Sequence, residues 1–390
     1  MKKLSWPILG KISQETFLKK YWQKKPLLMK GSLDSLGELI TPDEVAGLSC
    51  DERLESRLIL EKDGKSPWEV RRGPFKPTLF SKLPKTHWTV LVNGVDRFIP
   101  EVHKLVDQFS FIPFWRIDDI MISVAYDQGN VGAHVDNFDV FLVQASGTRE
   151  WLIEDKPRYQ DDFVPDLPIR LLKDFTPTNR WLLEPGDILY LPPRFAHHGI
   201  AQGNDCMTIS VGFRAPTVHE IAHGVLSEGL ASVDESDRYT DPNLSSQRPG
   251  EISSESIQRI RSLLLEKVLT EDAIGSWLGT SSTESYCDVE LPEKKRALTT
   301  SALEKKLSQA SHLVRVEGAR MAYIKTRKAG TIRFFANGSE SILSGPAAKL
   351  AQMIADKISN EISGINAHTT DATALDVVKD LLKRGLVVFE

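Results

Sequence analysis

Short hydrophobic runs separated by polar turns dominate residues 1–216 of the chain. The runs are of strand length, and proline, glycine and aspartate separate them: "WTVLVNGV", "IDDIMISVAY", "DVFLVQA", "REWLIE", "DILYLPP" and "CMTISVGF". Many short strands of this kind are typical of an antiparallel barrel or jelly roll. The pattern therefore predicts a β-rich domain, with a helix in "TPDEVAGLSCDE" that begins after the N-cap Thr41 and has Pro42 in its first turn.

After residue 216 the hydrophobic period becomes helical. In "TVHEIAHGVLSEGLASV", Ile221, Val225 and Leu230 recur at the spacing of one helical face. "SSESIQRIRSLLLEKVLTEDAIGSWLG" repeats the pattern after a polar loop, so residues 217–287 are predicted as a helical domain. Amphipathic helices outside a barrel can form a dimer interface or pack on their own domain, and the sequence leaves both open.

Residues 288–390 mix strand-like and helical segments. "HLVRVEGARMAYIK" and "TIRFFANGSES", with a turn at Asn337-Gly338, occur with the helical "GPAAKLAQMIADKIS" and "ATALDVVKDLLKRG". This combination predicts a small winged-helix-like domain. Acidic residues are scattered through it and it has no basic recognition helix, so we expect docking or structure rather than direct DNA binding.

Composition narrows the class of protein without deciding its function. The 390 residues carry a net charge of -4, which creates no overall field for nucleic acid or an anionic membrane. Cys50, Cys206 and Cys287 are far apart with no CxxC pair, so we expect a reducing, cytoplasmic setting rather than a disulfide scaffold. No run approaches the roughly 20 apolar residues of a membrane-spanning helix.

The segment "NVGAHVDNFDVFLVQ" carries candidate metal chemistry. If it is a strand, His134, Asp136 and Phe138 share one face, and Asn137 and Asp139 share the other. An isolated HxD is more often a surface histidine beside a solvated aspartate. A second segment changes this interpretation.

That second segment, "EPGDILYLPPRFAHHGI", supplies His197 after a double proline. Two histidines and one carboxylate with open coordination positions form the facial triad of non-haem Fe(II) oxygenases, whereas a structural zinc site would use a fourth ligand. The position after the prolines favours His197 over His198 as the ligand. His198 then has a supporting or surface role.

These motifs resemble a known family. "HVD" and "PPRFAH", framed by "WRIDDIMISVA" and "SVGFRAP", are similar to the JmjC-type 2-oxoglutarate oxygenases, as is the opening "FLKKYWQKKPLLMKG". Over its whole length the chain resembles the bacterial ribosomal oxygenases that hydroxylate an arginine of ribosomal protein L-sixteen. The resemblance implies a double-stranded β-helix, a helical dimerisation domain and a C-terminal winged helix. It also implies Fe(II), 2-oxoglutarate, O₂, a ribosomal protein substrate and a homodimer.

Arg149 is the candidate partner of the far carboxylate of 2-oxoglutarate. From sequence alone it is an arginine in a short polar turn, "GTREW", which would usually be solvated. The resemblance places the family's 2-oxoglutarate arginine here, and a guanidinium can bind a carboxylate through two parallel hydrogen bonds. Arg214 in "SVGFRAP" is the alternative, and Ser123 could bond the same carboxylate.

Alternation along "DDIMISVA" places Asp119, Met121 and Ser123 on one strand face. Asp119 could bind a substrate guanidinium, Met121 and Phe138 could enclose its aliphatic part, and Ser210 could add a hydrogen bond. The plainer alternatives are that Met121 and Phe138 are core residues and that Asp119 pairs with the nearby Arg116.

Several other functions stay open at this point. The resemblance implies β-carbon hydroxylation of an arginyl residue, with histidyl hydroxylation as the alternative, and Asp119 suits a cationic arginine better than a histidine. Lysine demethylation would need a methylammonium pocket. A cupin metalloenzyme without 2-oxoglutarate gains if Arg149 faces solvent, and a non-enzymatic docking barrel is disfavoured by the complete triad.

Overall fold

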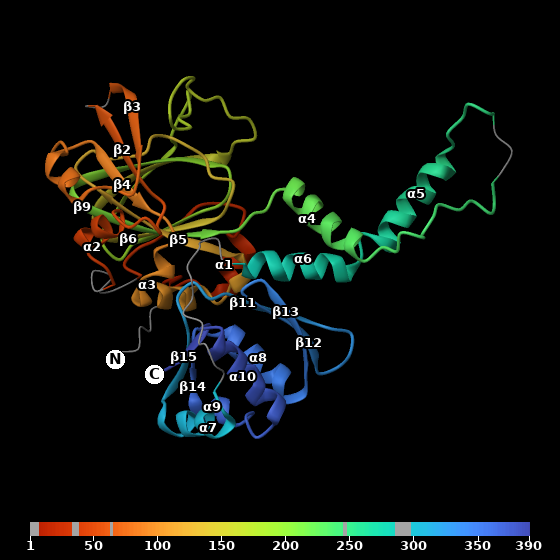
Figure 1. Ribbon diagram of the computed structural model, residues 1–390. Coiled ribbons are helices and arrows are strands. Elements are labelled where there is room, and N and C mark those ends of the chain that lie inside the picture. The colour runs from red at the N-terminus through yellow and green to blue at the C-terminus, as the bar shows by residue number, and fades with distance from the viewer. Residues whose placement is uncertain (1–7, 33–38, 63–64, 245–247, 285–297) are drawn as a thin grey trace.

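The computed structural model describes residues 8–32, 39–62, 65–244, 248–284 and 298–390. Figure 1 shows a β-rich barrel domain, a smaller C-terminal domain below it, and helices α4–α6 beside the two. We call these three helices the helical arm. The boundary predicted between residues 287 and 288, and Cys287, lie outside the described residues.

The barrel domain is one large antiparallel sheet. Its strands are β1 (Leu27–Met29), β2 (Ser56–Lys62), β3 (Lys65–Arg72), β4 (Trp88–Val92), β5 (Ile117–Ala125), β6 (Val140–Pro157), β7 (Asn179–Leu183), β8 (Ile188–Leu191) and β9 (Phe195–Phe213). They pair in the order β1-β8-β6-β9-β5-β4-β2-β3, with β7 on β6. Register shifts interrupt the long pair β6 and β9. Every strand pair in this sheet is antiparallel, as the predicted barrel or jelly-roll class requires.

Short helices and turns cover one side of this sheet. They are α1 (Gln14–Lys20), α2 (Pro42–Leu48), α3 (Pro100–Lys104), η2 (Pro77–Lys82), η3 (Val95–Arg97), η4 (Leu105–Phe109) and η5 (Phe114–Arg116). Thr41 caps α2 in a reciprocal capping box with Glu44, as predicted. One run differs from expectation, because "DVFLVQA" and "REWLIE" form a single strand, β6, in which Gly147 has a φ of 58°.

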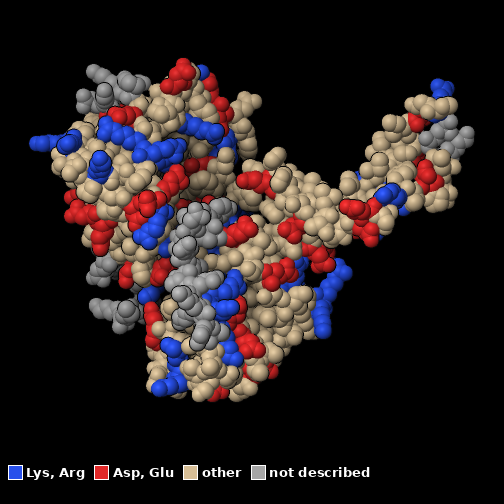
Figure 2. Space-filling view, in the orientation of Figure 1, with Lys and Arg blue, Asp and Glu red and all other residues tan. Residues whose placement is uncertain are grey.

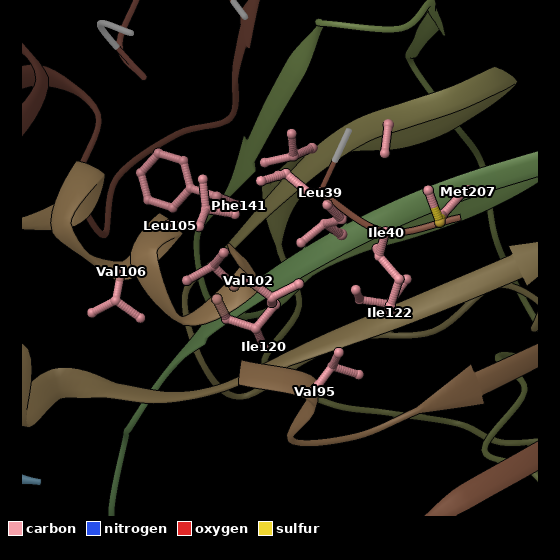
Figure 3. Close-up of a cluster of buried hydrophobic side chains, with 14 of the residues drawn as sticks. Leu39, Ile40, Val95, Val102, Leu105, Val106, Ile120, Ile122, Phe141 and Met207 are labelled. Atoms are coloured by element: carbon pink, nitrogen blue, oxygen red, sulfur yellow. The ribbon is translucent and has the colours of Figure 1, made fainter. Parts of the chain in front are cut away.

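Strand alternation divides the sheet into an apolar face and a more polar face. Ile120 and Ile122 of β5, Phe141 of β6 and Met207 of β9 point into the core that α3 and its neighbours cover (Figure 3). Each such buried side chain contributes about 1.5–3 kcal/mol of transfer free energy. The intervening positions point the other way, to the barrel interior, so Ser123 and Ser210 are free to serve a site there.

The helical arm contains α4 (Val218–Ala231), α5 (Ser254–Lys267) and α6 (Glu271–Thr283). Close contact between α4 and α6 requires glycine, since a Cβ on Gly224 would lie 1.9 Å from Trp277 Nε1. α5 and the adjoining loop project away from both domains (Figure 1). The arm was predicted as helical, and among the described residues no helix is long and apolar enough to cross a membrane.

The C-terminal domain has its own core and two three-stranded sheets. Its elements are α7 (Thr300–Gln309), β10 (His312–Arg315), β11 (Met321–Lys325), β12 (Thr331–Ala336), β13 (Ser339–Ser344), α8 (Gly345–Asp356), β14 (Ser359–Glu361), α9 (Ile362–Asn366), α10 (Ala372–Lys383) and β15 (Val387–Phe389). The predicted turn joins β12 to β13, with positive φ at both Asn337 and Gly338.

Candidate metal centre and its pocket

His134, Asp136 and His197 lie together, but not in the way the sequence predicted. The segment before β6 is not a strand: His134 makes one isolated bridge to His197, and residues 135–139 are irregular. The bridge is held by reciprocal backbone hydrogen bonds of 3.0 and 2.9 Å between the two histidines. Arg194 N–H, at 2.7 Å, binds the carbonyl of Asp136, so the irregular segment is fixed from the β8–β9 side.

The three side chains converge on one point. Asp136 lies 4.0 Å from Nε2 of His134 and 3.5 Å from Nε2 of His197, measured to its two carboxylate oxygens. One potential ligand atom from each residue lies within 4.8 Å of the others. This spacing is the one that a single ion needs when it is bound by two imidazoles and one carboxylate.

Hydrogen bonds orient both imidazoles for metal binding. Nδ1–H of His134 donates to the Gly132 carbonyl and Nδ1–H of His197 to the Phe195 carbonyl, each at 2.9 Å. Both Nε2 atoms therefore carry their lone pair toward Asp136. Burial, followed by the nearby His134, lowers the pKa of His197 to about 4, so His197 is neutral at physiological pH. The donor set fits a divalent metal ion.

Arg149 is buried inside the barrel, which answers the question that its sequence context left open. It lies in β6 rather than in a turn, opposite Ala201 of β9, and only 3% of its surface is exposed. Its guanidinium carbon lies 5.8 Å from the ring centre of Trp151, whose ring is in turn 5.8 Å from that of His197. Among the described residues, Nε and Nη2 of Arg149 have no hydrogen-bond partner. A buried guanidinium with open donors fits an anionic ligand close to the metal centre.

The other predicted pocket residues of β5 and β9 face the barrel interior. Met121 lies opposite Ser210 and Ser123 lies opposite Thr208 in the β5–β9 ladder. Ser123 and Ser210 are buried, and Met121 packs at the edge of a small apolar cluster with Trp68. Their predicted roles toward 2-oxoglutarate and substrate stay predictions.

Asp119 does not pair with Arg116, which lies 3.6 Å from Asp139 instead. The backbone N–H of Gly94 donates to Oδ2 of Asp119 at 3.1 Å. Burial, the carboxylates of Asp96 and Asp118, and only partial compensation by Arg97 raise the pKa of Asp119 to about 6. A carboxylate held in this way gains from a cationic partner.

Phe138 lies in the irregular segment before β6 and not on a strand face. It is 40% exposed and borders a cavity of about 310 Å³ together with Trp115, Asp118 and Trp277. A Cβ placed on Gly212 would lie 3.6 Å from Asp119 Oδ1 and 3.9 Å from the Phe138 ring, so the two side chains flank the same point of β9. The predicted strand at Phe138 is therefore wrong, but Phe138 still lies near Asp119.

His198 and Arg214, the two alternatives, have partners away from the triad. His198 is partly buried and its Nε2 lies 3.1 Å from Oδ1 of Asn130. Arg214 lies 3.4 Å from Asp118 and donates to the carbonyl of Ser281 in α6. Arg214 thus joins the barrel to the helical arm, so of the two candidate arginines Arg149 is the one buried within the barrel.

Sequence reasoning missed residues that support the site. Trp151 contacts both Arg149 and His197, and Asn130 binds His198, yet both appeared only as parts of strand or loop segments. Gly94, which orients Asp119, had no signal beyond a turn-like "NG". Contacts of this kind depend on the fold and not on local sequence.

Comparisons with known proteins agree with this geometry. The JmjC domain family matches residues 104–221, and the ROXA-like winged helix family matches residues 260–387. The chain is 30% identical, over 99% of its length and 98% of the relative's, to the ribosomal protein uL16 3-hydroxylase of Escherichia coli strain K12. The X-ray structure of E. coli YcfD matches with a TM-score of 0.85 and 30% identity, covering 98% of this chain and 99% of that one. YcfD in complex with cobalt and 2-oxoglutarate matches with a TM-score of 0.82 and 28% identity, with the same coverage.

Proposed function

The chain belongs to the JmjC-domain ribosomal oxygenases, and on that premise we propose that it hydroxylates the β-carbon of an arginyl residue in ribosomal protein uL16. The single observation that carries the proposal is the pairing of a metal-competent triad with the buried, partnerless donors of Arg149. A relative named as a uL16 3-hydroxylase and a related structure holding 2-oxoglutarate support the same assignment. A ribosomal protein substrate implies work in the cytoplasm.

His134, Asp136 and His197 are the proposed ligands of Fe(II), and Arg149 is the proposed partner of the far carboxylate of 2-oxoglutarate. When bound, the iron with O₂ and 2-oxoglutarate supplies the oxidising power for hydroxylation of an unactivated C–H bond, with succinate and CO₂ as coproducts. The protein's own contribution is to orient both imidazoles and to neutralise the cosubstrate's carboxylate at a buried site.

Asp119 is the proposed partner of the substrate guanidinium. Charge-assisted hydrogen bonds between a carboxylate and an arginine are among the strongest in proteins, and Asp119 is a carboxylate beside the barrel mouth with one backbone donor. Phe138 flanks it, and Met121 and Ser210 face each other further along the same strand pair. A cationic arginine fits this arrangement better than a histidine does.

The helical arm is proposed to bind a second copy of the chain. α4 exposes Leu226 and Leu230, and α5 exposes Ile257, Ile260 and Leu264, with Leu230 61% exposed. Figure 2 shows mostly uncharged surface along α4, whereas positive and negative side chains are interspersed over the rest of that face. A projecting apolar face of this kind is typical of an interface. Sedimentation of the wild type as a dimer, and of Leu230→Asp as a monomer, would support it.

The activity is tested by anaerobic reconstitution with Fe(II), followed by O₂, 2-oxoglutarate and recombinant uL16. Succinate formation with a gain of one oxygen atom on a single uL16 arginine, located by peptide mass spectrometry, is the expected result. Oxygen on a histidine would instead support histidyl hydroxylation. Succinate without any mass gain would keep the oxygenase and reject uL16 as its substrate.

A further inference from the structure

β5 departs from the regular ladder where Asp119 lies. β5 pairs with β9 at Ile117 and again at Ile120, and the register shifts between these two positions. A bulge of this kind takes backbone groups out of the ladder and redirects the side chain it carries. Carbonyls freed in this way need donors from elsewhere, so the direction of Asp119 depends on what supplies them.

Arg320, from the C-terminal domain, supplies two of these donors. Nη1 donates to the carbonyl of Ile117 at 2.8 Å, and Nη2 donates to the carbonyl of Asp118. Asn337 fixes the backbone of Arg320 from both sides, because its Oδ1 accepts from Arg320 N–H at 2.8 Å and its own N–H donates to the Arg320 carbonyl at 3.0 Å. The guanidinium is thus anchored to the turn between β12 and β13.

Asp96 and Gly94 hold the same segment from within the barrel domain. Oδ1 of Asp96 accepts from Ile120 N–H at 2.9 Å, and Gly94 N–H donates to Asp119 itself. Asp96 and Asp118 are also the nearby carboxylates that attract the Arg320 guanidinium. The bulge therefore has hydrogen-bond partners on both sides, and the outer pair of donors comes from another domain.

We propose that Arg320 is a positioning residue for substrate selection, which acts by fixing the β5 bulge so that Asp119 points at the guanidinium of the arginyl substrate. This inference rests on the proposed arginine hydroxylation and extends it. It gives the C-terminal domain a part in that reaction. His134, Asp136 and His197 lie on other segments, so the effect falls on recognition of the substrate side chain and not on the oxidation chemistry.

The test compares a uL16 peptide carrying arginine with the same peptide carrying citrulline, the neutral isostere. We measure the ratio of kcat/KM for the two peptides in full-length protein. The ratio measured for Asp119→Asn gives the value expected when the carboxylate charge is absent. Arg320→Met is expected to lower the ratio about tenfold toward that value, since small misplacements of a binding group cost this much or more. Arg320→Lys, which can reach one carbonyl, is expected to recover part of it.

Arg315→Met is the matched control. Arg315 is a buried arginine of the same domain whose Nη2 donates to the carbonyls of Ile354 and Ala355, each at 2.8 Å. Its guanidinium also lies 5.8 Å from the Phe114 ring of the barrel domain, but its hydrogen bonds go to the C-terminal domain and not to β5. Its removal should lower thermal stability as much as Arg320→Met does while the arginine-to-citrulline ratio is kept. An equal loss for both peptides in Arg320→Met, or an unchanged ratio, overturns the inference.

Hydrogen–deuterium exchange separates this inference from the proposed function. Without any substrate, the amides of residues 117–125 should exchange faster in Arg320→Met than in Arg315→Met. If the wild type shows no preference for the arginyl peptide but β5 exchanges faster in Arg320→Met, the proposed substrate is wrong and the positioning of β5 by Arg320 stands. If the wild type prefers arginine and β5 exchange is unchanged in both variants, the positioning role is wrong.

Discussion

The metal end and the Asp119 end of the barrel interior are held in place differently. The imidazoles of His134 and His197 are oriented by carbonyls of their own short segments, and Arg149 by its place in β6. Asp119, in contrast, lies in a bulge whose hydrogen bonds come partly from Arg320 in another domain. On the proposed assignments, the oxidation chemistry is contained in the barrel, whereas recognition of the substrate side chain depends on a contact between two domains.

The two ends also differ in what they leave unfilled. At the metal end, both Nε2 atoms face Asp136, and among the described residues the Nε and Nη2 donors of Arg149 have no hydrogen-bond partner. Asp119 already has one backbone donor and a raised pKa. The metal end is therefore suited to charged small ligands, and the Asp119 end is suited to a cation.

The largest effect is expected from removal of a proposed metal ligand. Asp136→Ala takes away the only carboxylate of the triad and should abolish succinate formation with and without uL16, a loss of about a thousandfold or more. Bound iron is measured in parallel, and it should fall to background. Asn137→Ala is the control, because Asn137 is adjacent to Asp136 and its Oδ1 accepts from Nη1 of Arg194. Retained iron and turnover in Asp136→Ala would reject the triad.

The sequence was most informative about the metal end. The proposed ligands lie in two short motifs, and the fold class that brings such motifs together was predicted from the alternation of strands and turns. The local geometry could not be predicted, because an irregular segment fixed by Arg194 replaces the expected strand at His134. Arg149 could not be assigned from sequence alone, since burial in β6 depends on pairing with β7 and β9.

The Asp119 end was less predictable for a physical reason. Alternation placed Asp119, Met121 and Ser123 on one face, and the ladder bears this out for the last two by pairing them with Ser210 and Thr208. Asp119 falls in the bulge, where simple alternation no longer applies. Gly94, which binds Asp119, and Arg320, which binds the two preceding residues, are distant in sequence and carry no motif.

The next largest effect is expected from Arg149. Arg149→Met keeps the length of the side chain and removes its donors, so the KM for 2-oxoglutarate should rise about a hundredfold, as expected for loss of one partner of a buried charge pair. Arg149→Lys should recover only part of the affinity, because an ammonium does not provide the two-pronged geometry. The arginine-to-citrulline ratio of the peptide substrates should stay at its wild-type value. A change in that ratio would show that the two ends are not independent.

Asp119→Asn should weaken the use of the arginyl peptide and leave 2-oxoglutarate binding unchanged. The effect should be somewhat smaller than that of Arg149→Met. The kcat/KM for the arginyl peptide should fall by about 2 kcal/mol, or roughly thirtyfold, because a neutral amide replaces a charged acceptor. The KM for 2-oxoglutarate is the internal control and should not follow it. The pKa of Asp119 is higher in the folded protein than in the unfolded chain, so its ionised form lowers the free energy of unfolding, fully so above pH 6. The same substitution should therefore increase thermal stability at pH 7.5. A loss of stability instead would mean that Asp119 is a structural carboxylate.

The smallest effect is a pH dependence confined to the Asp119 end. Asp119, with a pKa near 6 set by burial and by Asp96 and Asp118, is charged above that pH and neutral below it. The arginine-to-citrulline ratio should therefore be constant above pH 7 and fall up to tenfold by pH 5, and it should be flat in Asp119→Asn. Taking the ratio cancels every effect of acid on the metal ligands and on 2-oxoglutarate, since both peptides use the same metal end. The kcat/KM of the free enzyme reports this pKa, because a bound guanidinium would lower it. A ratio that falls in the wild type and in Asp119→Asn alike would assign the titration to another group and would remove Asp119 from substrate recognition.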